Sequence, residues 1–323
     1  MRTETGHSDR LAGTLLGLAT GDALGAGYEF AAPPEGDAEM IGGGLGCWEP
    51  GEWTDDTQMA VCVAETLAAR GLDLDGIGRR FLDWYASGPA DVGNQTSAVL
   101  GGAASPGDLR RVAADYVARN PGAGAGNGSL MRTAPVALAF LGDDEAIASA
   151  ARAVSGLTHG DPLAGDACVL WCIAIDRAVR EERLDGARDG LLLLEPGADE
   201  RWAVWLDAAE REPLRSFRPN GFVVTALQAA HGAIWQTPVP DDRPRRHLEL
   251  ALQAAVSVGD DTDTVAAIAG ALLGARWGAA AVPGHWRRLV HGWPGLTADD
   301  LVTLAERLAA APQPGSRRSP SEQ

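Results

Sequence analysis

Apolar residues recur at helical spacing along almost the whole chain, and this pattern narrows the possible folds more than any other feature. Segment 9–26 places Leu11, Leu15 and Leu18 on one face, and Ser8 precedes them as a candidate N-cap. Alternating runs typical of strands are nearly absent. The pattern predicts an all-α protein of about ten to thirteen helices. Further expected helices are 57–70, 74–87, 108–118, 129–141, 144–154, 163–181, 222–236, 246–258, 264–277 and 297–311.

Length and composition favour one compact domain. The chain has 323 residues, of which 46% are hydrophobic and 22% are charged, which is enough to bury one large core. We expect this domain to span residues 1–311. The polar segment 312–323 is expected to be a disordered tail.

The chain is strongly acidic, with a net charge of −17, and all of its 27 basic residues are Arg. The absence of Lys excludes chemistry that depends on a P-loop lysine or a Schiff base. The acidity argues against nonspecific binding to nucleic acid or anionic membranes, and it is compatible with a site that collects cations. No signal-peptide pattern and no uninterrupted apolar run of about 18 residues occurs, so we expect a cytoplasmic monomer without a membrane segment.

Two short acidic motifs are the strongest chemical signal in the chain. Segment 54–57 reads Thr-Asp-Asp-Thr, and segment 260–264 reads Asp-Asp-Thr-Asp-Thr. Each follows a glycine-containing turn and opens a helical run. Thr and Asp are ordinary N-caps, so either motif alone could serve only to begin a helix. Two similar copies with consecutive oxygen donors exceed what capping requires.

If the two motifs meet in space, their carboxylates repel one another and raise each other's pKa. Divalent cations remove this penalty, and two of them balance the charge of four Asp side chains. Oxygen ligands without His or Cys favour Mg²⁺ or Mn²⁺ over Zn²⁺. The candidate ligands are Thr54, Asp55, Asp56, Asp261, Asp263 and Thr264.

A glycine-rich loop, 122–128, leads into the expected helix 129–141. Glycine at alternate positions lets backbone N–H groups approach a ligand closely, and a helix N-terminus attracts phosphate. The alternative is a flexible linker, and the loop alone does not decide between the two.

Five motifs in a fixed order resemble the ADP-ribosylglycohydrolase family, and together they cover about residues 9–278. The motifs are Gly-Asp-Ala-Leu-Gly at 21–25 with Glu29-Phe30, Gly-Glu-Trp-Thr-Asp-Asp-Thr-Gln at 51–58, Gly-Asn-Gly-Ser-Leu-Met-Arg at 126–132, Thr158-His159, and Gly-Asp-Asp-Thr-Asp-Thr at 259–264. Segments 91–96 and 220–224 resemble the bacterial branch typified by the dinitrogenase-reductase-activating glycohydrolase.

The resemblance implies an all-α fold with two Mg²⁺ or Mn²⁺ ions in a cleft, and it carries over the same six metal ligands. It also implies cleavage of the glycosidic bond between ADP-ribose and an acceptor. The family commonly has glycine where Asp260 stands. Asp260 could therefore be a cap, a group behind the ligands or an alternative ligand.

Contacts to ADP-ribose are also implied by the resemblance, because relatives hold the diphosphate on the glycine-rich loop and place a histidine near the nucleotide. These expected contacts are Gly124, Gly126, Asn127, Gly128, Ser129, Met131 and His159. The expected catalytic carboxylates are Glu29, Asp91 and Asp56. Glu29 and Asp91 are candidates to handle the water or the leaving group, and their division of labour stays open.

The acceptor is less constrained than the reaction. The bacterial branch favours ADP-ribosylated arginine on a protein, while serine, a nucleobase, a phosphate terminus and O-acetyl-ADP-ribose stay open. Two other classes compete with this interpretation. One is a non-catalytic ADP-ribose-binding protein, and the other is a two-metal phosphohydrolase that would cut within ADP-ribose.

Overall fold

The computed structural model describes the backbone of residues 2–311 and the side chains from Gly6 onward. This part of the chain contains fifteen α-helices and one small antiparallel sheet, in which β1 (His291–Gly292) pairs with β2 (Leu296–Thr297). The prediction of an all-α protein is confirmed, although the helices are more numerous than expected. The predicted tail 312–323 lies outside the described residues.

Most of the long helices begin and end close to the expected positions. They are α2 (Asp55–Arg70), α3 (Leu74–Ala86), α5 (Leu109–Arg119), α7 (Asp144–Ser155), α8 (Pro162–Glu181), α11 (Val223–Gln236), α12 (His247–Val256), α13 (Thr262–Trp277) and α15 (Ala298–Ala309). The shorter helix α4 (Asn94–Gly102) follows Asp91. The helices that were not expected are α9 (Ala187–Gly190), α10 (Ala198–Arg211) and α14 (Gly284–Leu289).

Two predicted helix starts are wrong. Helix α1 runs over Arg2–Gly25, so Ser8 lies inside it and is no N-cap; its hydroxyl instead reaches Glu306 on α15. The expected helix 129–141 shortens to α6 (Ala134–Ala139). Residues 128–132 form turns instead, in which the carbonyl of Asn127 accepts the backbone amides of both Leu130 and Met131.

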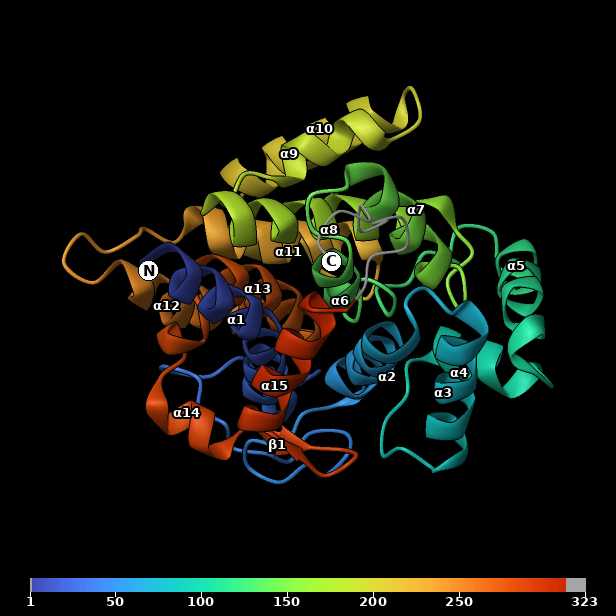
Figure 1. Ribbon diagram of the computed structural model, residues 1–323, viewed down its shortest axis with the longest axis horizontal. Coiled ribbons are helices and arrows are strands. Elements are labelled where there is room, and N and C mark those ends of the chain that lie inside the picture. Colours follow the sequence, from blue (N-terminus) through green and yellow to red (C-terminus); the bar gives the residue numbers. More distant parts are fainter. Residues whose placement is uncertain (1, 312–323) are drawn as a thin grey trace, which may run out of the picture.

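Helices α1 and α13 touch backbone to backbone, and this contact positions the site. A Cβ atom added at Gly17 would lie 2.3 Å from the carbonyl oxygen of Gly270, and one at Gly21 would lie 2.0 Å from that of Ala266. Only glycine permits so close an approach. Figure 1 shows the two helices side by side near the middle of the molecule. As a result, the last turns of α1 lie against the first turns of α13.

The core is built around α13, whose residues are almost all buried. Trp171 of α8 donates a hydrogen bond from its indole nitrogen to the carbonyl of Ile268, at 2.9 Å, and so ties α8 to α13. Helices α9 and α10 form an outer layer over α11, while α3, α4 and α5 lie beyond α2 on another side (Figure 1). Within residues 2–311, no helix is both long and apolar enough to cross a membrane.

Candidate metal centre and ligand cleft

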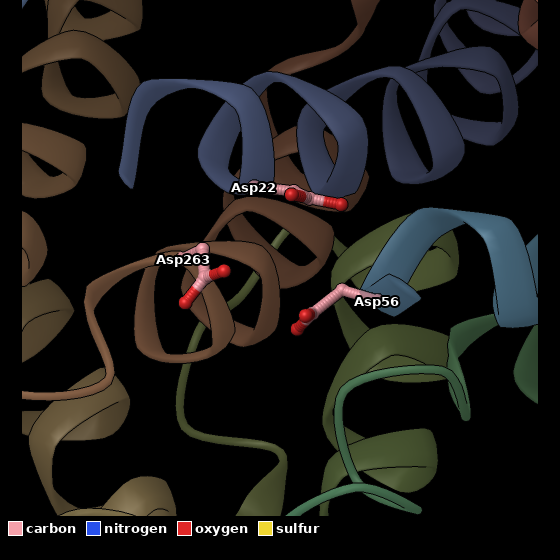
Figure 2. A group of neighbouring side chains, drawn as sticks. All are labelled: Asp22, Asp56 and Asp263. Atoms are coloured by element: carbon pink, nitrogen blue, oxygen red, sulfur yellow. The ribbon is translucent and has the colours of Figure 1, made fainter. Parts of the chain in front are cut away.

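Three carboxylates from three helices meet at the buried end of a cleft. Asp22 comes from α1, Asp56 from the first turn of α2 and Asp263 from the first turn of α13, and one oxygen of each lies within 4.8 Å of the others. Figure 2 shows the three side chains around a common space. Asp263 also belongs to a second such group with Glu29 and Asp261. The two acidic motifs of the sequence therefore meet in space.

Asp22 organises the start of α2 and is the residue that the sequence analysis missed. One of its carboxylate oxygens accepts the backbone amide of Thr54 at 2.9 Å, and the other accepts both the amide and the hydroxyl of Thr57. Burial raises the pKa of Asp22 to about 6 against the opposing effect of these hydrogen bonds. A signal was present, because Asp22 lies in the family motif at 21–25, but no role was assigned to it.

The start of α13 is held from two other segments. The side-chain amide of Asn127 donates to the carboxylate of Asp261 at 2.7 Å, and the backbone amide of Asp261 donates to the side-chain oxygen of Asn220 at 2.9 Å. The Asp263 carboxylate accepts the backbone amide of Thr264. The glycine-rich loop and the 220–222 segment thus fix the second acidic motif from either side.

The hydroxyls of Thr54 and Thr264 both donate to one oxygen of Asp56, at 3.1 and 3.4 Å. The other oxygen of Asp56 and one oxygen of Glu29 are buried, and within residues 6–311 neither has a hydrogen-bond partner. Thr54 and Asp261 are the N-cap residues of α2 and α13, yet in this part of the chain neither side chain makes a capping bond. Helix capping therefore does not explain the motifs.

Burial raises the pKa of Asp55, Asp56 and Asp263 well above the ordinary range, and neighbouring carboxylates raise it further. Burial, and then the charges of Asp261 and Asp91, raise the pKa of Glu29 to about 9. Buried acceptors without partners, crowded by like charges, are the arrangement that a bound cation relieves. The residues present therefore fit a metal with oxygen ligands.

The cleft has a volume of about 470 Å³. Glu29, Asp55, Asp261, Asp263 and Thr264 line its acidic end. Its other side is lined by loop residues and one imidazole: Gly126, Asn127, Gly128, Met131 and His159. Both halves of the predicted site therefore face one space.

Asp91 also lines the cleft, in the segment before α4. Its charge lies close enough to raise the pKa of both Glu29 and Asp55. The backbone at Gly93, two residues on, opposes this rise in the pKa of Asp55, so this segment lies close to the start of α2. The two candidate catalytic carboxyls, Glu29 and Asp91, thus flank the acidic cluster.

Several predicted residues do not line the cleft. Thr54 and Asp56 are buried behind its wall. The Ser129 hydroxyl accepts a hydrogen bond from Ser155, and the carbonyl of Gly124 accepts one from Gln95. The expectation that a helix N-terminus directly follows the loop is wrong, because turns separate the loop from α6.

Asp260 is directed toward Arg218. Its backbone is left-handed, with φ of 61°, which is the conformation that favours glycine and explains the family's usual residue there. Its carboxylate forms an ion pair with Arg218 and is in neither acidic group. Asp261 and Asp263, in contrast, both line the cleft.

Comparison with known proteins decides the family. A sequence model described as ADP-ribosylglycohydrolase matches residues 3–317. The chain belongs to the ADP-ribosylglycohydrolase family. The resemblance inferred from the motifs, including that to the bacterial branch, is confirmed.

The relatives of this chain include two whose names refer to ADP-ribosylarginine and to dinitrogen reductase. The chain is 32% identical to the "ADP-ribosylarginine hydrolase Tri1" of Pseudomonas putida, over 86% of this chain and 73% of that protein. It is 30% identical to the "ADP-ribosyl-[dinitrogen reductase] glycohydrolase" of Rhodospirillum rubrum, over 86% and 89%. A solved structure titled "ADP-ribosylglycohydrolase-related protein complex" superposes with a TM-score of 0.73 at 33% identity, covering 94% of this chain and 98% of that one.

Proposed function

We propose that this family member is a hydrolase that uses two divalent cations, Mg²⁺ or Mn²⁺, to release ADP-ribose from modified arginine on a protein. The observation that carries the proposal is the meeting of the two acidic motifs beside unpartnered oxygens of Asp56 and Glu29. The name of the Pseudomonas putida relative, an ADP-ribosylarginine hydrolase, supports arginine as the acceptor, and that of the Rhodospirillum rubrum relative supports a modified protein as the substrate.

The residues that would hold the cations are those of the two motifs: Thr54, Asp55, Asp56, Asp261, Asp263 and Thr264. Asp22 supports them by holding Thr54 and the first turn of α2. When bound, the cations would neutralise the acidic cluster and grip the vicinal hydroxyls of the ribose that is cut.

The remaining residues bind the substrate and move protons. The backbones of Gly126 and Gly128 leave room for the diphosphate, and His159 and Met131 border the same space. Glu29 and Asp91 flank the acidic end and are the carboxyls available for proton transfer, since cleavage needs a proton on the departing nitrogen and one taken from water. The half-buried carboxylate of Asp91 in the cleft lining also suits the cationic guanidinium of the arginine.

The test is product analysis with arginine-ADP-ribosylated protein, after chelation and again with Mg²⁺ or Mn²⁺ restored. We expect release of intact ADP-ribose only with metal. Asp263→Asn is expected to abolish it, and Asp242→Asn, which alters an exposed loop acid, is expected to leave it unchanged.

The other outcomes separate the alternatives. If ADP-ribose binds in a metal-dependent way but is not released from arginine, the proposed site stands. The substrate would then carry ADP-ribose on serine or on a nucleic acid, or would be O-acetyl-ADP-ribose. Release of AMP or phosphate would indicate a phosphohydrolase. If ADP-ribose is neither released nor bound, the proposal is overturned.

A further inference from the structure

A chain of hydrogen bonds runs from a buried guanidinium to the imidazole in the cleft. Arg132 donates from Nη2 to the hydroxyl of Thr158 at 2.7 Å, and that hydroxyl lies 2.8 Å from Nδ1 of His159. All three residues are buried. The chain thus links the interior behind the glycine-rich loop to the ligand side.

The direction of each hydrogen bond follows from the chemistry of the donors. A guanidinium can only donate, so the Thr158 oxygen accepts from Arg132. The hydroxyl keeps one proton to donate, and donation of that proton to Nδ1 of His159 is the arrangement that suits a neutral ring with Nδ1 unprotonated. An imidazole nitrogen that accepts carries no proton, so the ring proton resides on Nε2.

The ring is held neutral as well as oriented. Burial, and then the charge of Arg132, keep the pKa of His159 well below its usual value. Gln95 and Thr96 of α4, whose polar atoms lie near the same loop glycines as the ring, are uncharged. Arg132 therefore supplies the charge that opposes protonation of the ring.

Nε2 lies directly against the glycine-rich loop. A Cβ atom added at Gly126 or at Gly128 would come within 3.3 Å of it. His159 also lines the cleft, so a donor on Nε2 is available to an oxygen atom of a ligand held by the loop.

Arg132 has few other partners that would explain its burial. Its Nη1 lies 3.4 Å from the sulfur of Met59, and its guanidinium stacks 4.5 Å from the centre of the Phe81 ring. Within residues 6–311 it forms no ion pair, and its Nε has no hydrogen-bond partner. Burial of a cation without a carboxylate partner opposes folding, so a role beyond stability is indicated.

We propose that Arg132 and Thr158 are positioning residues that hold His159 as the neutral Nε2–H tautomer, so that the ring donates a hydrogen bond to a diphosphate oxygen over a wide pH range. The identity of that ligand rests on the proposed function, whereas the tautomer does not. A neutral, fixed donor would bind the anion equally well on either side of neutral pH.

The tautomer is tested by ¹⁵N NMR of the histidine rings in the full chain, with the His159 signals assigned from their loss in His159→Gln. We expect an unprotonated Nδ1 and a protonated Nε2, without titration between pH 5.5 and 8. Thr158→Ser keeps the hydroxyl and should preserve this spectrum. Thr158→Val should shift the Nδ1 signal, while Thr66→Val, which removes a buried hydroxyl from α2, should not.

The affinity for ADP-ribose, measured by calorimetry with metal present, tests whether the positioned ring contributes to ligand binding. Loss of one fixed hydrogen bond should weaken binding about tenfold at pH 8 in Thr158→Val. In Arg132→Met, the ring should regain an ordinary titration and binding should strengthen on acidification.

An imidazolium or an Nδ1–H tautomer in the wild-type chain at pH 7 would overturn the proposal. The proposal would also be overturned if Thr158→Val changed neither the Nδ1 signal of His159 nor the affinity for ADP-ribose. If the spectrum is as expected but ADP-ribose does not bind, the proposed function fails and the positioning role stands. The wild-type spectrum decides the tautomer even if a variant fails to fold.

Discussion

The hydroxyl of Thr264 donates a hydrogen bond to the carboxylate of Asp56 at 3.4 Å and joins residues that lie 208 positions apart in the chain. The first turns of α2 and α13 therefore share one polar surface. On that surface the second oxygen of Asp56 is buried and, in the part of the chain described, makes no hydrogen bond. This hydrogen bond brings the carboxylate of Asp56, from the first acidic motif, against the second motif behind the wall of the cleft.

Replacement of Asp56 by Asn tests the metal centre. Asn keeps the size of the side chain but removes a negative charge, so we expect loss of bound Mn²⁺ and a fall in turnover of about 10² or more. Metal content by elemental analysis and release of ADP-ribose measure the two effects. Asp242→Asn is the matched control on an exposed loop. Full metal content in Asp56→Asn would contradict the assignment.

The stability of the metal-free protein should fall as the pH rises. The pKa of Asp22 is raised to about 6 and that of Glu29 to about 9, and those of the cluster carboxyls are raised also. A raised pKa means that the folded state binds the proton more tightly than the unfolded state. This stabilisation is therefore complete below about pH 4 and is lost as the pH rises through the raised pKa values. Metal binding needs deprotonated ligands and should follow the opposite trend.

The corresponding measurement is the melting temperature with and without Mn²⁺ at pH 5 and pH 8. We expect the increase caused by Mn²⁺ to be larger at pH 8. A larger increase at pH 5 would show that these carboxyls do not compete with the metal for protons.

Gly17→Ala should destabilise the whole domain by about 3 kcal/mol, because the added Cβ would lie 2.3 Å from the carbonyl of Gly270 and force α1 away from α13. Chemical denaturation at fixed metal concentration measures the change. Gly36→Ala is the control, since no described atom lies within 4 Å of its Cβ. An unchanged midpoint for Gly17→Ala would mean that the two helices are not in backbone contact.

Asp260→Gly should retain full metal content and turnover. The substitution removes the ion pair with Arg218, which is partly exposed, and it suits the left-handed backbone, so the two effects on stability oppose each other. Metal titration by calorimetry compares the variant with the wild type. A clear loss of bound metal would make Asp260 a ligand and shift the register of the second motif.

Helical class and the positions of most long helices could be predicted from the sequence, because both depend on the local spacing of apolar residues. The expected run 74–87, for example, is observed as Leu74–Ala86. Local spacing is less reliable at the starts of helices. Residues 128–132 form turns before α6, and the helix at the N-terminus begins before Ser8.

The candidate site, like the fold, was only partly predictable from the sequence. By itself the sequence determined the oxygen-rich chemistry, since two runs of Asp and Thr at helix starts are visible without any fold. Tertiary structure alone decided that Asp22 supports them, that Asp260 turns to Arg218, and that Thr158 connects Arg132 to His159. These relationships depend on contacts between segments that lie far apart in the chain. The one that involves Asp22 also depends on the glycines that let α1 and α13 pack in backbone contact, which apolar periodicity does not encode.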